Sequence, residues 1–151
     1  MIAQLQIIGS VALAMLLCAF VGIERELADK PAGFRTHMLV GGAAALLVGL
    51  SNIIVTTAQL NNTSIQSDPI RVLEAIIAGI SFLGAGTIFR RTESGVTEGL
   101  TTAAALLFVA GIGASVAVGQ LVLAVCATAL ALLVLRGAGY IEAHWLTRQQ
   151  K

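Results

Sequence analysis

Charge is confined to short gaps between long apolar runs, and this feature most constrains what the chain can fold into. Nine Lys and Arg and eight Asp and Glu make seventeen charged residues, and six of them lie within residues 22–37. Only 11% of the 151 residues are charged, against about 25% in globular domains. Because about 20 apolar residues in a helix cross the hydrocarbon core of a bilayer, the pattern predicts an all-α, polytopic transmembrane helix bundle.

The apolar runs predict five membrane spans. The first run is interpreted as a retained span and not as a secretory signal, because no basic residue precedes it. Asp68 and Pro69 favour a helix start, since Asp caps free N–H groups and Pro is tolerated at the first helical position. We therefore expect one transmembrane domain over residues 1–136 and a short interfacial cytoplasmic tail over residues 137–151. The expected spans cover residues 5–23, 36–57, 69–89, 100–115 and 119–136.

The last two spans come from dividing one stretch that has no charged residue, residues 99–135. This stretch is too long for one ordinary span. The alternative is a single long span followed by a re-entrant segment. The expected break is marked by a run of small and polar residues, Gly111, Gly113, Ser115, Gly119 and Gln120.

The basic residues predict the orientation of the five spans. With five spans, eight of the nine basic residues fall on one side of the membrane, and only Arg71 falls on the other. By the positive-inside rule the N-terminus is outside and the C-terminus is cytoplasmic. The eight on the cytoplasmic side are Arg25, Lys30, Arg35, Arg90, Arg91, Arg136, Arg148 and Lys151.

The charged gap between the first two spans is the first candidate site. The simple interpretation is a connector that anchors two helices at the interface through local ion pairs. The functional interpretation is a cytoplasmic binding site, because Glu24 directly follows an apolar run and its carboxylate then needs a cation or Arg35 as a partner. The candidate binding residues of this gap are Glu24, Arg25, Glu26, Lys30, Arg35, Thr36 and His37, and Arg90 in a later connector is added to them.

A second candidate lies at the start of the third span, where Asp68, Arg71 and Glu74 are spaced three apart and share one helix face. An ionisable residue at membrane depth suggests a functional site, although an Arg71–Glu74 pair at the outer interface would also explain the spacing. The same face continues through small and polar residues, which suits a helix interface or a hydrated cavity. These are Ala78, Ser81 and Ala85.

Glycines at regular spacing predict close helix packing. Gly41 and Gly49 lie on one face of the second span, where small residues let helix backbones approach closely. Gly79, Gly84 and Gly86 would do the same in the third span, or would break that helix and free backbone carbonyls for an ion. The spacing fits packing inside one chain and a seam between two copies equally well, so a homodimer stays open.

Several classes of function find no support in the sequence. The chain has no nucleophile elbow, metalloprotease helix or zinc constellation, so we do not expect an enzyme. A net charge of +1 gives no general attraction for nucleic acid. Cys18 and Cys126 both lie in apolar runs, which favours free thiols.

Several ordered segments resemble the signature of the MgtC/SapB family. Together they cover roughly residues 20 to 115. Ser81 departs from the pattern, because that motif usually has Gly there. The segments are residues 22–26 (GIERE), 30–37 (KPAGFRTH), 68–71 (DPIR), 79–86 (GISFLGAG) and 96–104 (VTEGLTTAA).

This resemblance implies a multi-pass protein of the bacterial inner membrane that is linked to magnesium homeostasis and adaptation to low magnesium. Its best-known branch is linked to virulence and is often encoded beside a magnesium-transporting P-type ATPase. Longer members carry a cytoplasmic ACT-like domain after the last span. Because the sequence stops at Lys151, a short form without that domain is expected.

Three functional hypotheses follow. The first is a non-enzymatic protein that binds or regulates a membrane partner, such as a P-type ATPase or another ion-coupled complex. The second is a small transporter or channel for a divalent cation, with Mg²⁺ held by oxygens of Glu24, Glu26 and Glu74, because hard cations need oxygen ligands. The third is a lipid-binding scaffold that uses Arg25, Lys30 and Arg35 against headgroup phosphates in the bilayer.

Overall fold

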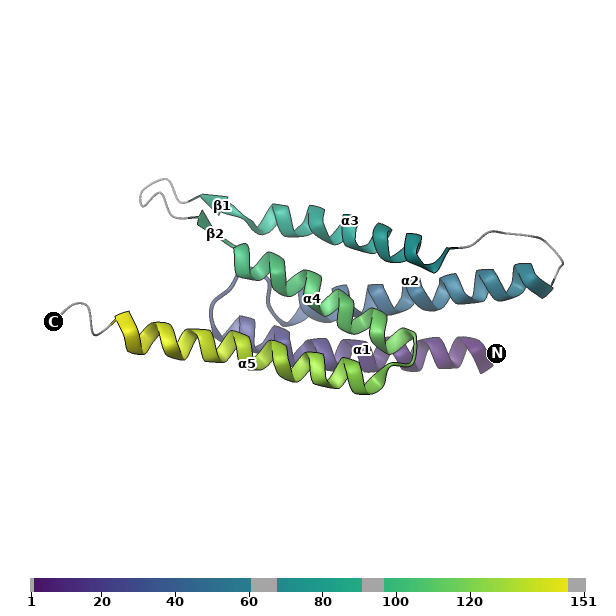
Figure 1. Ribbon diagram of the computed structural model, residues 1–151, viewed down its shortest axis with the longest axis horizontal. Coiled ribbons are helices and arrows are strands. Elements are labelled where there is room, and N and C mark those ends of the chain that lie inside the picture. The colour runs from purple at the N-terminus through teal and green to yellow at the C-terminus, as the bar shows by residue number, and fades with distance from the viewer. Residues whose placement is uncertain (1, 61–67, 91–96, 147–151) are drawn as a thin grey trace.

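The computed structural model describes residues 2–60, 68–90 and 97–146 and consists of five helices and one short strand pair (Figure 1). The strand pair consists of β1 (Phe89–Arg90) and β2 (Thr97–Glu98), which are antiparallel. Apart from this short strand pair, the described chain is helical, which confirms the predicted all-α class. The helices are α1 (Ile2–Leu27), α2 (Phe34–Leu60), α3 (Pro69–Thr87), α4 (Leu100–Ala117) and α5 (Leu121–Leu146).

Four helices of the described chain, α1 to α4, are long and apolar enough to cross a membrane. The part of α5 whose side chains are described, Leu121–Gly137, is apolar but shorter. Successive helices run in alternating directions, so the connector between α1 and α2 lies at the opposite end of the bundle from the N-terminus (Figure 1). The chain is thus a multi-pass membrane protein.

The charge-free stretch contains α4, a turn and the start of α5, so the expected break is present. The break between α4 and α5 covers fewer residues than expected. Gly111 and Gly113 lie inside α4, and the chain turns at residues 118–120. Gly119 has a φ of 80° there, which a residue without a Cβ adopts at little cost.

The third helix is continuous but ends before the predicted boundary of residue 89. Ile88 is already extended, with φ of −90° and ψ of 117°. The Thr87 hydroxyl donates to the carbonyl of Gly84 at 2.7 Å and closes the last turn. Phe89 and Arg90 then pair with β2 instead of extending the helix. The hypothesis of a broken third helix is therefore wrong, because its glycines are accommodated within α3.

The core lies where α1, α2 and α4 meet. A Cβ on Gly41 of α2 would overlap the sulfur of Cys18 in α1, and a Cβ on Gly113 of α4 would overlap the carbonyl oxygen of Gly41. Cys18 and Val109 are fully buried beside these glycines. Small residues thus bring the three backbones into direct contact, which is how helices gain packing energy in lipid.

Candidate functional site

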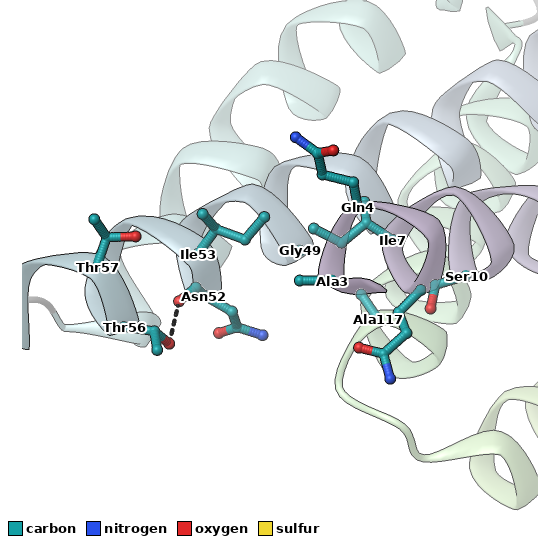
Figure 2. A pocket seen from close by; sticks show the side chains of 11 residues that line it. Ala3, Gln4, Ile7, Ser10, Gly49, Asn52, Ile53, Thr56, Thr57 and Ala117 are labelled. Carbon is teal, nitrogen blue, oxygen red and sulfur yellow. Dashed lines mark hydrogen bonds between the residues drawn. The ribbon is translucent and has the colours of Figure 1, made fainter. Parts of the chain in front are cut away.

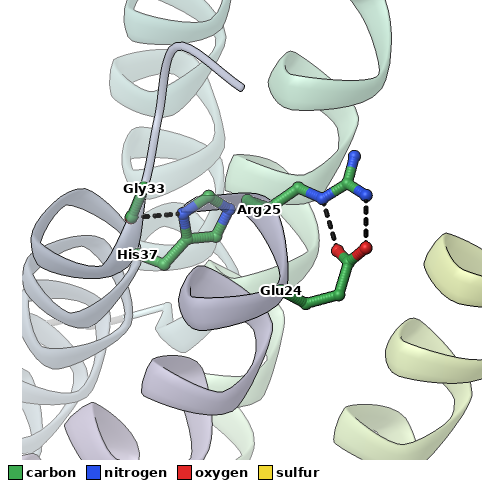
Figure 3. Close-up of polar contacts among 4 residues, drawn as sticks. All are labelled: Glu24, Arg25, Gly33 and His37. Atoms are coloured by element: carbon green, nitrogen blue, oxygen red, sulfur yellow. Dashed lines mark hydrogen bonds and ion pairs between the residues drawn. The ribbon is translucent and has the colours of Figure 1, made fainter. Parts of the chain in front are cut away.

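A buried ion pair lies at the end of α1 in the charged gap. Arg25 donates from Nε to Oε2 of Glu24 at 2.5 Å and from Nη2 to Oε1 at 2.7 Å, a two-pronged contact (Figure 3). Glu24 is 7% exposed and Arg25 is 4% exposed. Paired burial of this kind removes the cost of an isolated charge. The guanidinium that Glu24 needs therefore comes from Arg25, whereas Arg35 is exposed.

His37, in the first turn of α2, is fully buried beside this pair. Its Nδ1 donates to the carbonyl of Gly33 at 2.9 Å, so that Nε2 is the acceptor when the ring is neutral (Figure 3). Among the described residues Nε2 has no hydrogen-bond partner. His37 thus ties the end of the connector to the first turn of α2 and does not face solvent.

The connector between α1 and α2 is held by a side-chain hydrogen bond and by close contacts. Glu26 accepts from the N–H of Phe34 at 2.9 Å and so caps the start of α2. A Cβ on Gly33 would press on that carboxylate, and a Cβ on Gly22 would come within 2.8 Å of the Phe34 Cα. Glycine is therefore required at position 22 by close approach of the Phe34 backbone, whereas a Cβ at position 33 would have to displace the Glu26 side chain.

The remaining polar residues of the gap face outward. Lys30, Arg35 and Thr36 are exposed, as is Glu26 apart from its capping bond. The predicted set thus divides into a buried part that holds the helices together and an exposed basic part that is free to meet a partner or a headgroup.

The second predicted cluster lies at the other end of the bundle. Asp68 accepts from the N–H of Ile70 at 2.9 Å and caps α3. Arg71 and Glu74 are both exposed. Although both side chains belong to the described part of the chain, no ion pair joins them. The Arg71–Glu74 pair offered by the sequence is therefore absent from the structure.

The two clusters do not converge. Glu24 and Glu26 lie near the end of α1, and Glu74 lies near the start of α3, which is the opposite end of the bundle (Figure 1). Within residues 2–60, 68–90 and 97–146 no group of three His, Cys, Asp or Glu side chains is close enough to hold a metal. The candidate Mg²⁺ ligands therefore lie at the two ends of the bundle, with Glu24 and Glu26 far from Glu74. Arg90 belongs to β1, and its side chain lies outside the described part.

Some of the glycines that were predicted to lie at helix contacts do so. Gly41 and Gly49 pack against α1, where a Cβ on Gly49 would come within 3.0 Å of Ile7, and Gly84 packs against Ala103 of α4. A Cβ on Gly79 or Gly86 would meet nothing within 4 Å. Among the described residues, α3 has no close neighbour at these two positions.

The side of α3 away from α2 and α4 is not covered by any other described element. Val72 is half-buried and Ile76, Ile80 and Gly84 are buried on the packing side, whereas the residues on the other side are exposed. We call this exposed set, Glu74, Ala78, Ser81 and Ala85, the outer face of α3. The outer face of α3 places the carboxylate of Glu74 one turn inside the candidate span Ile70–Thr87.

A polar pocket of about 500 Å³ lies between the start of α1 and the last turns of α2 (Figure 2). The sequence interpretation missed it. Gln6 and Ser10, like Asn52 and Thr56, are four apart inside apolar runs, and this spacing could have revealed a shared polar face. The polar lining residues are Gln4, Gln6, Ser10, Asn52, Thr56 and Thr57.

Comparison with known proteins gives a consistent result. A model of the MgtC family matches residues 11–144. The chain is 33% identical over 148 residues to an uncharacterized protein of Haemophilus influenzae, which covers 98% of this chain and 61% of the relative. It is 36% identical over 123 residues to "Putative magnesium transporter YhiD" of Escherichia coli, covering 82% and 56%.

The chain is also 40% identical over 119 residues to Protein MgtC of Salmonella typhimurium, covering 79% of this chain and 46% of that protein. It therefore spans about half to three fifths of the length of these relatives. No solved structure matches.

Proposed function

The chain belongs to the MgtC family, and from this premise we propose that it is a bacterial inner-membrane protein of magnesium homeostasis that acts by binding a membrane partner. The proposal assigns it a regulatory role and no enzymatic one. The observation that carries it is the outer face of α3, which holds Glu74 among small residues.

Glu74 needs a partner because of its depth. The candidate span Ile70–Thr87 has 18 residues, and 18 residues of helix rise about 27 Å, close to the roughly 30 Å of the hydrocarbon core. The whole helix is then needed to cross, which puts Glu74 inside the hydrocarbon. A charged side chain there is costly unless it faces another polar group.

The small neighbours of Glu74 favour a protein as that partner. Ala78, Ser81 and Ala85 let another helix approach closely, and the Ser81 hydroxyl offers a hydrogen bond across the contact. A P-type ATPase or another ion-coupled complex would meet these requirements, and so would a second copy of this chain. At the cytoplasmic end, exposed Lys30 and Arg35 would meet acidic groups of the same partner.

In this proposal α5 is a fifth span, the N-terminus is outside and the C-terminal part is cytoplasmic. The support is the positive-inside rule, since basic residues gather at the end where α1 meets α2 and where β1 lies. A Lys30→Cys variant in a Cys126→Ala background should react with a membrane-impermeant maleimide only after the cells are opened. Reaction in intact cells would reverse the orientation.

The alternative function is transport of Mg²⁺ by the chain itself, and the polar pocket in Figure 2 favours it. Amide and hydroxyl oxygens can receive a magnesium ion that keeps several of its waters. The name of the Escherichia coli relative points the same way. In this alternative Gln4, Gln6 and Asn52 contact the hydrated ion.

Purified protein in liposomes that contain a magnesium-sensitive dye separates the two functions. We expect Mg²⁺ uptake no faster than in protein-free liposomes, because the regulatory role needs the partner. Saturable uptake by the wild type that falls in a Gln4→Ala/Asn52→Ala variant would contradict the proposal and establish transport through the pocket.

A further inference from the structure

A long apolar groove runs between α2 and α3. It consists of two cavities of about 480 and 310 Å³ that share Leu47, Ala75 and Ile76. The groove exists because the facing residues include small ones, Ala43 on α2 and Gly79 on α3, so the two helices do not fill the space between them.

One cation lies at the mouth of this groove. Arg71 lines the cavity nearer the start of α3, together with the hydroxyl-bearing Ser51 of α2, and the other lining residues of that cavity are apolar. Arg71 is exposed. Within the described part of the chain no ion pair or side-chain hydrogen bond holds its guanidinium.

The length of the groove matches one leaflet. It extends from Arg71 to Leu83, and the twelve residue steps between them rise about 18 Å in a helix. One leaflet of the hydrocarbon core is about 15 Å thick. An apolar trough of leaflet depth with one guanidinium at its polar end has the form of a phospholipid, with the phosphate at the arginine and an acyl chain along the trough.

Charge complementarity selects this occupant. Guanidinium groups bind phosphate oxygens through two parallel hydrogen bonds, and an arginine near the start of a span lies at headgroup depth. A helix from a second protein would fill the apolar trough but would have to bring an acidic side chain to Arg71, whereas a phospholipid carries its phosphate at the end of its acyl chains. At the other end of the bundle Glu24 already occupies the guanidinium of Arg25, so that arginine cannot serve a headgroup.

We propose that the groove between α2 and α3 binds one phospholipid, with its phosphate on Arg71 and Ser51 and an acyl chain along Leu47, Ala75, Ile76 and Gly79. The lipid site uses residues of α3 that line the cavities against α2, and it shares no residue with the outer face of α3. The lipid covers the face of α3 that α2 leaves open and holds the two helices in register.

Native mass spectrometry of the detergent-purified chain with added phosphatidylglycerol tests this site. We expect one retained lipid on the wild type and at least tenfold weaker retention on Arg71→Gln, because a charge-assisted contact is lost. Arg136→Gln is the matched control, since Arg136 is exposed on α5 and lines no described cavity. Diacylglycerol, which lacks the phosphate, should not be retained.

A second pair of variants tests the trough without touching the cation. Ala75→Phe fills the groove and should abolish retention, whereas Ala78→Phe, on the outer face of α3, should leave it unchanged. Each variant is first required to elute as the wild type does in size-exclusion chromatography. Equal loss in Arg71→Gln and Arg136→Gln, or full retention in Ala75→Phe, would overturn the proposal.

Discussion

Replacing Gly113 by alanine will lower the free energy of unfolding by about 3 kcal/mol, a large overpacking effect. The new methyl group would overlap the carbonyl oxygen of Gly41, which is backbone and cannot rotate away. Helices α2 and α4 must therefore separate, and the contact of both with Cys18 is lost. Denaturant titration of the purified protein in mixed micelles, followed by circular dichroism, measures the change.

Gly111 provides the control for this substitution. It lies two residues away in the same helix, and a Cβ there would meet nothing within 4 Å. Gly111→Ala should therefore be neutral or stabilise by up to about 1 kcal/mol, because alanine favours the helix over glycine. Equal stability of the two variants would show that α2 and α4 do not pack as described.

Replacing Arg25 by alanine should destabilise the protein by about 3–5 kcal/mol, the range for removing one partner of a buried ion pair. The carboxylate of Glu24 would remain buried without its cation. Arg35→Ala is the matched control, because Arg35 is in the same segment but exposed, and exposed substitutions usually change stability by no more than about 0.5 kcal/mol.

A double variant separates loss of the pair from loss of packing. Glu24→Leu/Arg25→Met removes both charges and keeps apolar volume, so it should recover most of the stability lost in Arg25→Ala. If Arg25→Ala is as stable as Arg35→Ala in the same denaturant titration, the buried pair does not hold the end of α1, and the structural interpretation of the charged gap fails.

The sequence predicts the helices well because each span carries its own signal, an apolar run of sufficient length. It also marks the charged gap as the place where two helices are joined. It could not show which charges pair, because the partner of Glu24 depends on side-chain direction at the end of α1. The adjacent Arg25 pairs with Glu24, whereas Arg35 is exposed and does not pair with it.

The sequence also could not show how the candidate Mg²⁺ ligands lie relative to one another. Spacing along the chain shows which residues share a helix face, but not which ends of different helices meet. The alternation of helix direction puts Glu74 away from Glu24 and Glu26. The polar pocket was missed because its residues are uncharged and scattered in two apolar runs, so that only the packing of α1 on α2 brings Gln4 and Asn52 together.

The central claim is that the outer face of α3 docks a membrane partner, and photo-crosslinking in intact cells tests it most directly. A benzophenone amino acid is placed at Ala78 or Ser81 and, as the control, at Leu133, which is 68% exposed on α5. The account predicts one protein adduct of defined mass from both α3 positions, weakened by Glu74→Gln and absent from Leu133. An adduct of twice the chain mass would identify a second copy as the partner. The absence of a defined adduct from Ala78 and Ser81, or the same adduct from Leu133, would contradict the account.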